Sequence, residues 1–540
     1  MKSVLDLSRG SPSGHRLDQD GPGGPGPRGS FWVRTEPSCY VLSRWIFLRG
    51  LGIIYLAAFG SLAVQILGLV GSDGILPLPD YLTSAYQQLD SRAYHLLPTL
   101  CWFNKSDSML LFLCWGGVGL SVMLIFGLAQ VPVLALLWGF YLSLVVAGQV
   151  FLNFQWDTLL LETGLLAVFY APLQCFPNPS VERAPAPVAR WMIWFLLFKL
   201  MFLSGITKLL SQDETWANWT ALYFYYETQP LPTGAAWYVH HLPHWFHRFS
   251  CGAMYFIEIG CPFLIFVPVR LRMVRRVAAL LMIGFQLLII ATGNYGFFNW
   301  LTIVLCFSLL DDGFWLCGLP LRLQGVFSDR HDRLPETWFR RIVVAALAAT
   351  LLPLSGLMIY REMRTTRPAA GQARELPGWC NQLASWIRPY RSMNGYGLFR
   401  VLTTERRELV LEASHDGQQW EEYSFRWKPG AVDQCPGLVA PHMPRLDWQM
   451  WFAALQRRGL PPWIRPFIQH LLEGTPEVKS LLAGPFWGDR PPRSIRLVRY
   501  DYRFARPDDG DNADAWWIRS QRTQLTPAMS LEPNTGSKDR

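Results

Sequence analysis

Two carboxylates, Asp157 and Glu162, stand in the mainly apolar stretch QWDTLLLETG (155–164). A charged side chain at the centre of a bilayer costs at least about 2.5 to 3.5 kcal/mol, so it normally faces a partner or a water-filled cavity. Asp157 is compatible with a simple cap at a helix N-terminus, where the helix dipole favours an anion. Glu162 lies deeper in the stretch and needs a partner.

Lys199 and Glu258, on two later apolar segments, are the expected partners of Glu162. Lys199 would neutralise its charge, whereas Glu258 could approach only if the two carboxyl groups shared a proton. Two interpretations follow. Either a buried pair locks one helix to another, or the four residues form an intramembrane site for proton transfer, where buried carboxylates with shifted pKa values are typical. These four residues are Asp157, Glu162, Lys199 and Glu258.

A second polar group lies in segment 213–247, which interleaves histidines with many aromatic residues. His240, His244 and His247 would share one helical face, as metal ligands can. Pro243 would interrupt that helix, and no nearby carboxylate or cysteine completes a set of ligands. We therefore predict an aromatic belt at a membrane interface, and no metal. The residues of this segment expected to meet a partner protein are Trp219, Glu227, Gln229, His240 and His241.

Motifs for common enzyme chemistry are missing from the sequence. There is no G-x-S-x-G, Walker or dinucleotide-binding motif in a strand–turn–helix context, so neither a nucleophile nor a cofactor is predicted. The formal net charge is +9, but the arginines are spread over loops and tail, without a basic helix or an aromatic RNA-binding motif. We attribute this charge to loops kept on the cytoplasmic side, and we expect no nucleic-acid partner.

The composition indicates a membrane protein, because 51% of the residues are hydrophobic and only 16% are charged. A helix needs about 20 mainly apolar residues to cross the ~30 Å hydrocarbon core of a bilayer. The sequence predicts a polytopic α-helical membrane protein with about nine such spans, followed by a C-terminal, mainly β, soluble domain. The predicted spans are 45–70, 109–128, 131–152, 158–176, 191–210, 252–269, 277–292, 297–316 and 342–360.

Clusters of arginine predict which ends of the spans face the cytoplasm. The arginines at 270–276 mark one cytoplasmic loop, and those of the N-terminal arm mark another. Counting through nine spans then places four parts of the chain together on the lumenal or periplasmic side: segments 71–107 and 211–250, the turn at Asn294, and the C-terminal domain. The arginines directly after the last span run against this orientation.

The last third of the chain changes from apolar runs to alternating patterns. The expected strands are 399–403, 408–413, 420–427 and 494–504, and the expected helices are 447–456 and 463–473. Cys380 and Cys435 both lie in this polar part, where a disulfide bridge and two unpaired thiols are equally compatible with the sequence. The predicted division is a disordered tail at 1–40, a transmembrane domain at 41–360, a C-terminal domain at 361–525 and a disordered tail at 526–540.

Long motifs of mixed polar and aromatic residues run through both halves of the chain. They are QWDTLLLETG (155–164), FYYETQPLPT (224–233), HHLPHWFHRF (240–249), GNYGFFNWLT (293–302), NGYGLFR (394–400), and the run from YSFRWKPG to RLDWQMWFAAL (423–455). Together they make the chain, from about 45 to 520, resemble the lipase maturation factor family.

The resemblance implies a multi-pass protein of the endoplasmic reticulum membrane, which homodimeric lipases such as lipoprotein lipase need to reach an active fold. It also implies a C-terminal domain that faces the lumen and binds the client lipase. In a bacterial member the corresponding place is the inner membrane, with the domain in the periplasm. The membrane half is also similar, more distantly, to the transmembrane region of vitamin K-dependent gamma-carboxylase, which keeps an enzymatic interpretation open.

Two hypotheses result. The first is a membrane-anchored maturation factor, not an enzyme, that binds a folding client lipase. Trp448 and Trp451 are candidate anchors for that contact, and removal of 375–525 is expected to abolish binding while the membrane half stays inserted. The second is a membrane enzyme built on the four intramembrane residues. The hypotheses differ in whether those side chains converge on one open cavity or pair off in a closed bundle.

Overall fold

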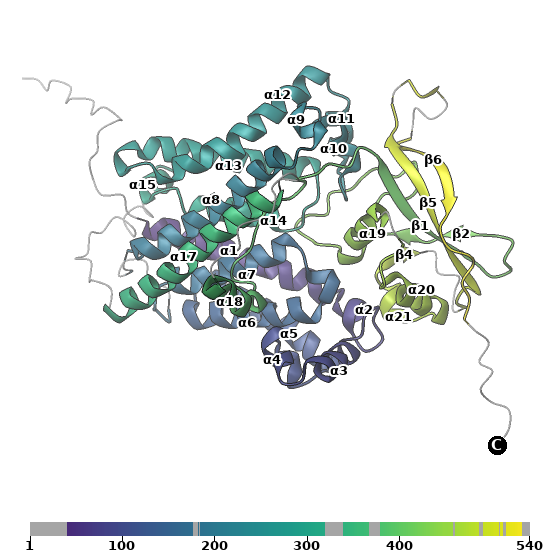
Figure 1. Cartoon of the computed structure of the whole chain (residues 1–540), viewed down its shortest axis with the longest axis horizontal. Coiled ribbons are helices and arrows are strands. Elements are labelled where there is room, and N and C mark those ends of the chain that lie inside the picture. Colours follow the sequence, from purple (N-terminus) through teal and green to yellow (C-terminus); the bar gives the residue numbers. More distant parts are fainter. Residues whose placement is uncertain are drawn as a thin grey trace, which may run out of the picture. The chain divides into compact units, whose positions relative to one another are not determined.

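A computed structural model describes residues 40–176, 182, 184–318, 338–366, 378–456, 459–484, 490–506, 508–510 and 515–531. The described residues form a bundle of helices, followed by a small β-sheet with short helices around it (Figure 1). Residues 1–39 and 532–540 of the two predicted disordered tails lie outside the described residues, whereas residues 526–531 are described and Met529 forms a β-bridge with Ile495.

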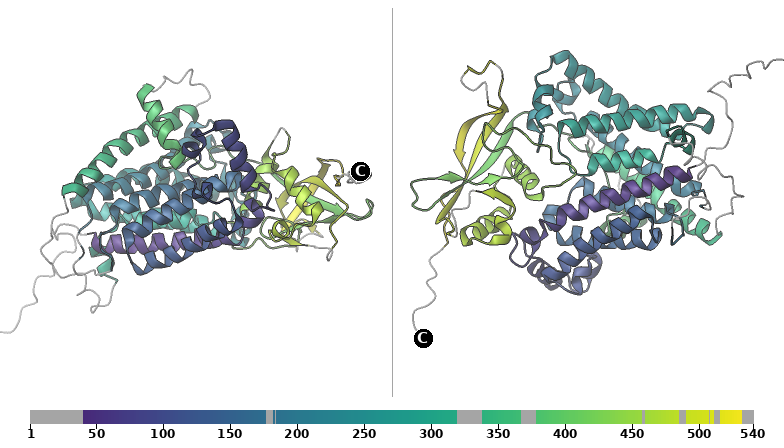
Figure 2. Two further views of the ribbon diagram at one scale, coloured as in Figure 1. Left: turned by 90° about the horizontal axis from the view of Figure 1, so that it is seen from below. Right: turned by 180° about the vertical axis from the view of Figure 1, so that it is seen from behind.

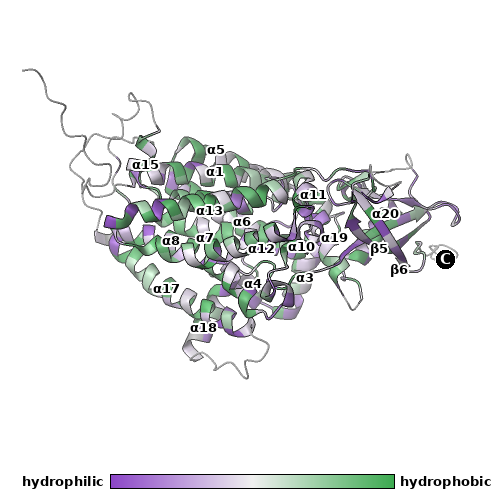
Figure 3. Cartoon of the chain, turned by 90° about the horizontal axis from the view of Figure 1, so that it is seen from above, coloured by the Kyte–Doolittle hydropathy of each residue, from purple (hydrophilic) through white to green (hydrophobic). Residues whose placement is uncertain are grey.

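Seven helical segments in the described residues are long and apolar enough to cross a membrane. They lie side by side (Figure 2), and hydrophobic residues cover most of their length (Figure 3). These segments are α1 (Val41–Ala63), α5 (Asp107–Phe126), α6 (Gln130–Ala147), α8 (Pro187–Leu210), His244–Phe266 (α12, η4 and η5), Val269–Thr292 (η6 and α13) and Arg341–Thr366 within α17 (Trp338–Thr366). The predicted fold class, a polytopic helical membrane protein with a β-rich C-terminal domain, is confirmed.

The other two predicted spans correspond to shorter helices, α7 (Gln155–Tyr170) and α14 (Phe298–Phe307). At about 1.5 Å per residue, ten residues of α14 extend only about 15 Å, half the hydrocarbon thickness. Most side chains of α7 and α14 are buried among the longer helices. The prediction of about nine spans therefore counted two short buried helices with seven long ones.

One end of the bundle carries cationic side chains, and we call it the cationic end. There Arg44 pairs with Glu182 at 2.8 Å, and Arg276 pairs with Asp311. Ser43 near the start of α1 donates to the carbonyl of Phe307 at the end of α14. The cationic end thus joins segments that the charge pattern had placed together.

The C-terminal domain contacts the opposite end of the bundle. Asn294 donates to the carbonyl of Gly437 at 2.8 Å, and α2 (Ile66–Val70) packs on α21 (Pro476–Lys479). Segment 227–230 contacts the first strand of the domain through Arg406. These contacts group segment 211–250, the Asn294 turn and the C-terminal domain at one end, and segment 71–107 begins there, directly after α2, as the charge pattern predicts.

Short helices complete the bundle. At the domain end they are α3 (Leu78–Leu89), α4 (Arg92–Leu96), η1 (Leu100–Trp102), η2 (Gln149–Leu152), α9 (Glu214–Ala217), α10 (Leu222–Thr228), α11 (Gly234–His240), α18 (Gly378–Ile387) and η7 (Arg388–Tyr390). At the cationic end lies α15 (Asp312–Leu316).

The C-terminal domain is built on an antiparallel sheet in the order β2-β1-β5-β6. Alternation along β1 (Arg406–Ser414) sends Leu409, Leu411 and Ala413 to one face of the sheet, but Glu408 and Glu412 on the other face are buried as well, so both faces of this strand are covered. The four strands are β1 (Arg406–Ser414), β2 (Glu421–Glu422), β5 (Ser494–Phe504) and β6 (Trp517–Gln524). A second pair is formed by β3 (Ser424–Phe425) and β4 (Leu482–Gly484), and the main helices are α19 (Arg445–Leu455) and α20 (Ile464–Glu473).

The strand predicted at 399–403 is wrong. This segment has no β partner, because its backbone binds the bundle: the Trp216 indole donates to the carbonyl of Phe399 at 2.9 Å, and the Leu402 amide donates to Asp213 at 3.2 Å. The segment begins in a turn, with Phe399 at a positive φ of 55°, so its alternating residue types do not form a strand.

Candidate functional site

The contact region between the bundle and the C-terminal domain, here the bundle–domain interface, collects most of the polar residues singled out from the sequence. Asp157, in the first turn of α7, receives both terminal nitrogens of Arg445, the first residue of α19, at 2.6 and 2.8 Å. Tyr141 donates to the same carboxylate at 2.6 Å. Asp157 is 0% exposed and Arg445 1% exposed. Asp157 is therefore an anchor for the C-terminal domain and not only a helix cap.

Glu162 occupies a second buried cluster one and a half turns along α7. One carboxylate oxygen pairs with Lys199 of α8. The other accepts hydrogen bonds from Tyr396 at 2.8 Å and from Asn394 at 3.2 Å. Lys199 also lies over the Tyr396 ring, 5.4 Å from its centre. The predicted Glu162–Lys199 pair is present, and the NGYG segment closes it from the domain side.

Glu258 does not join Glu162. It lies in the one-turn π-helix η4 (Phe256–Gly260), and its two oxygens receive Lys208 at 2.8 and 2.6 Å. Lys199 and Lys208 are nine residues apart on α8, about 13.5 Å at 1.5 Å per residue, so the two pairs are separate sites. The four intramembrane candidates pair off and do not converge on one cavity.

A third cluster holds the loop after α10. Arg406 of β1 donates to the carbonyls of Glu227, Gln229 and Pro230, with 2.7 Å to Glu227 and 2.9 Å to Pro230. Its charge is balanced by Glu408 at 2.5 Å, which also forms an ion pair with Lys428, with the charged atoms 2.9 Å apart. A strand of the domain thus fixes the loop of the FYYETQPLPT motif through backbone carbonyls.

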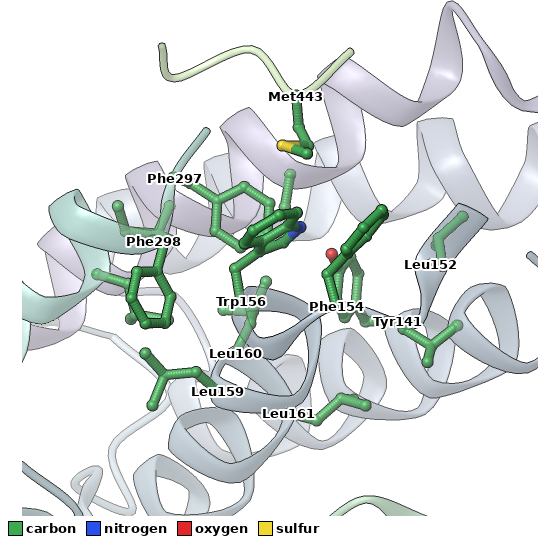
Figure 4. Packing of buried hydrophobic residues seen from close by; sticks show 14 of the residues in the cluster. Tyr141, Leu152, Phe154, Trp156, Leu159, Leu160, Leu161, Phe297, Phe298 and Met443 are labelled. Carbon is green, nitrogen blue, oxygen red and sulfur yellow. The ribbon is translucent and has the colours of Figure 1, made fainter. Parts of the chain in front are cut away.

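The segment before α19 follows the end of the bundle closely. Asn294 accepts the amides of Val439 and Ala440 at 2.7 and 3.0 Å. Gln65, just after α1, donates to the Met443 carbonyl at 3.0 Å and accepts the Arg445 amide at 2.9 Å. The buried Met443 side chain lies close to Trp156 and Phe297 (Figure 4).

Three residues predicted to meet a client are instead part of this interface. Trp448, 2% exposed, lies against Trp156 with ring centres 4.7 Å apart, and Trp451 donates to the Thr228 carbonyl at 3.0 Å. Gln229, 1% exposed, donates to the Thr292 carbonyl at 2.7 Å. All three side chains are buried, and those of Trp451 and Gln229 are also hydrogen-bonded, so in this structure they hold the domain against the bundle.

The remaining predicted contact residues lie nearer the surface. Trp219 is 47% exposed. Glu227 accepts the Phe504 amide at 3.2 Å, and its carboxylate lies 3.6 Å from the Nε2 atom of His240. Burial lowers the pKa of His240 to about 4 and raises the pKa of Glu227. The Nδ1 atom of His241 donates to the Trp237 carbonyl at 2.7 Å. Among the described residues, no three His, Cys, Asp or Glu side chains are grouped so that they could hold a metal ion.

Cys435 is an exposed free thiol next to Gly234. The side chain of Cys380 lies outside the described residues. Within the described part of the chain, Cys435 is therefore not bridged.

These features define a polytopic membrane protein whose C-terminal domain is fixed to one end of the helical bundle by buried ion pairs. Residues 42–317 match the model for the lipase maturation factor transmembrane domain, and residues 392–527 match the model for the lipase maturation factor C-terminal domain. The chain belongs to the lipase maturation factor family. No solved structure matches it.

Relatives in vertebrates align over nearly the whole chain. The chain is 37% identical to lipase maturation factor 2 of Gallus gallus, over 90% of this chain and 81% of that protein. It is 34% identical to lipase maturation factor 1 of Homo sapiens, over 94% of this chain and 91% of that protein. These matches lend no support to a bacterial source or to the similarity with gamma-carboxylase.

Proposed function

We propose that this protein is a membrane-embedded maturation factor that helps secreted, homodimeric lipases fold and assemble. The match to lipase maturation factors across both the membrane and the C-terminal domain carries the proposal. Its relatives are named as maturation factors and not as enzymes. The closed pairing of Glu162 with Lys199, and of Glu258 with Lys208, supports a structural role for the intramembrane charges.

The proposed place of action is the lumenal side of the endoplasmic reticulum membrane. Cationic residues gather at the end of the bundle opposite to the C-terminal domain, and such residues favour the cytoplasmic side. A folding lipase would then meet the C-terminal domain and the loops beside it. The bilayer and the client lipase are the partners that this proposal requires.

One face of the C-terminal sheet is suited to the client contact, and we call it the arginine–aromatic face. Arg496 lies over Trp420 at 3.8 Å, and Arg519 lies over Tyr500 at 4.7 Å. Arg522 donates to the Tyr500 hydroxyl at 3.2 Å, and its side chain is 42% exposed. Tryptophan, tyrosine and arginine are the residues that most often dominate protein–protein contacts. Here they stand on a rigid sheet beside the membrane domain.

Deletion of the C-terminal domain is a poor test, because it would leave Asp157 without Arg445 and Glu162 without Tyr396. A sharper test is the double variant Tyr500→Ala, Arg522→Ala, with Arg407→Ala as the control. Arg407 is also a partly exposed arginine in a salt bridge, but it lies on the other face of β1.

Each variant is co-expressed with a homodimeric lipase in cells that lack their own maturation factor, and secreted lipase activity is compared at equal membrane-protein level. We expect activity with wild type and Arg407→Ala, and a large loss with the double variant. If the wild-type chain yields no more active lipase than an empty vector, the proposed function is wrong. If the double variant is as active as wild type, the client does not use this face.

A further inference from the structure

An open, apolar groove of about 550 Å³ lies on the side of the bundle. One wall is α17, with Ala346 and Leu347, and the other is formed by Trp138 of α6 and by Leu165 and Phe169 of α7. Its volume is in the range of small-molecule sites, about 300 to 1,000 Å³. Nearly all of its surface is apolar, which suits a hydrocarbon ligand.

The depth of the groove limits what can occupy it. Both α6 and the part of α17 that lines the groove belong to segments long and apolar enough to cross the membrane. An apolar cavity is not stably filled by water, and at this depth the surrounding medium is lipid. The nearest available occupant is therefore an acyl chain of the bilayer.

One end of the groove has the chemistry of a membrane surface. It is lined by Trp386 of α18 and by Tyr390, and both rings lie close to His95, with centres 5.7 and 5.8 Å away. Trp386 is 61% exposed. Tryptophan and tyrosine gather where hydrocarbon meets head groups, so this end belongs at the interface on the side of the C-terminal domain.

Two arginines are sequence neighbours of the lining residues at this end of the groove. Arg388 follows Ile387, and Arg391 lies between Tyr390 and Ser392. Arg391 donates one hydrogen bond to Asn153 at 3.0 Å, which leaves other guanidinium protons for a ligand. Burial and the positive charge of Arg388 lower the pKa of Arg391, so an anion between them would relieve their repulsion. Guanidinium groups match phosphate oxygens in geometry and charge.

We propose that this groove is a site for one phospholipid of the bilayer, with an acyl chain between α17 and the pair α6–α7, and an anionic head group at Arg388 and Arg391. The inference is independent of the lipase client, since it rests on the depth, lining and charge of the groove.

Native mass spectrometry of the full-length protein in detergent, titrated with phosphatidylglycerol or phosphatidylcholine, tests the site. The variant Ala346→Trp fills the groove. Its control is Ala345→Trp, because Ala345 is exposed on the same helix but turned by about 100° and does not line the groove. The double variant Arg388→Gln, Arg391→Gln removes the charge, and the double lysine variant keeps it.

We expect the wild type and Ala345→Trp to retain one phosphatidylglycerol molecule, with at least a tenfold loss of affinity in Ala346→Trp. The preference for phosphatidylglycerol over phosphatidylcholine should disappear in the glutamine variant and persist in the lysine variant. Equal lipid retention by Ala346→Trp and Ala345→Trp would overturn the site. A photo-crosslinker at position 346 that captures a protein instead of a lipid in native membranes would also overturn it, in favour of a helical partner.

Discussion

Replacing Arg445 with methionine would leave Asp157 as a buried carboxylate that keeps only its hydrogen bond from Tyr141. Both oxygens of Asp157 receive Arg445, and neither residue is more than 1% exposed. Removal of one partner from such a buried pair costs about 3 to 5 kcal/mol, because the other charge is left unpaired. At about 1.4 kcal/mol per factor of ten, the open form of the bundle–domain interface becomes roughly 100- to 4,000-fold more populated.

Limited proteolysis in detergent measures this opening. Cleavage that requires a transiently open form follows the population of that form when closing is faster than cutting. We expect Arg445→Met to be cut between the bundle and the C-terminal domain at least 100-fold faster than wild type, given the energy above. Asp157→Asn should behave similarly, because it leaves the guanidinium buried and unpaired.

The double variant Asp157→Asn, Arg445→Met separates pairing from packing. Without either charge, most of the penalty disappears, so the double variant should be more resistant than Arg445→Met alone. If the two single effects simply add in the double variant, the pair contributes no coupling energy and our account of the bundle–domain interface is refuted. Arg407→Ala, which breaks an exposed pair, provides the control and should change the cutting rate less than about fivefold.

Three further predictions concern other parts of the same protein. Glu162→Gln should lower the thermal stability of the purified protein, because Lys199 is left buried without its counter-charge, and the double variant Glu162→Gln, Lys199→Met should recover part of the loss. Lipase activity per folded molecule should stay unchanged in Glu162→Gln. A selective loss of that activity would indicate chemistry inside the membrane. The pKa of His240 is lowered from 6.5 to about 4, so its stabilising contribution is complete above pH 6.5 and is lost as the pH falls toward 4. The protection of segment 234–247 against hydrogen exchange, corrected for the pH dependence of the intrinsic exchange rate, should therefore fall over that range in wild type and much less in His240→Asn. Asn294→Ala removes the acceptor for the amides of Val439 and Ala440 and the donor to the Gly437 carbonyl. These three backbone groups lose their partner, which should destabilise segment 437–445 by about 2 to 4 kcal/mol and speed hydrogen exchange there. Unchanged exchange would contradict the role assigned to Asn294.

Hydropathy and local charge were sufficient to predict those parts of the fold that depend on residues close together in the sequence. The spans followed from runs of apolar residues, and the pairing of Glu162 with Lys199 followed from the cost of an unpaired charge in the membrane. Strands β1 and β5 followed from alternation. The two short helices α7 and α14 were counted as spans because the bundle, and not their own length, buries them.

The partners of the other charges depend on tertiary contacts that no local pattern reveals. Arg445 is 288 residues from Asp157, and it lies just before the helix that the sequence predicts at 447–456. In the structure both sides of α19 are covered, which is why Trp448 and Trp451 are buried and not free for a client. Lys208 was missed because a lysine in the last turn of a helix also fits a favourable position near the helix dipole.

The motifs that carry the family resemblance converge on the bundle–domain interface. QWDTLLLETG supplies Asp157 and Glu162, GNYGFFNWLT supplies Asn294, NGYGLFR supplies Tyr396, and RLDWQMWFAAL supplies Arg445. Their unusual mixture of polar and aromatic residues is explained by docking, since each polar group must be paired when the interface closes. The motifs therefore build a fixed platform, and we propose that a client contacts partly exposed residues outside them, such as those of the arginine–aromatic face. Variants in the motifs should fail by loosening the domain, with faster proteolysis, whereas variants on that face should fail with the domain still closed. The two kinds of defect can be told apart in one protein preparation, which makes the division of roles open to direct test.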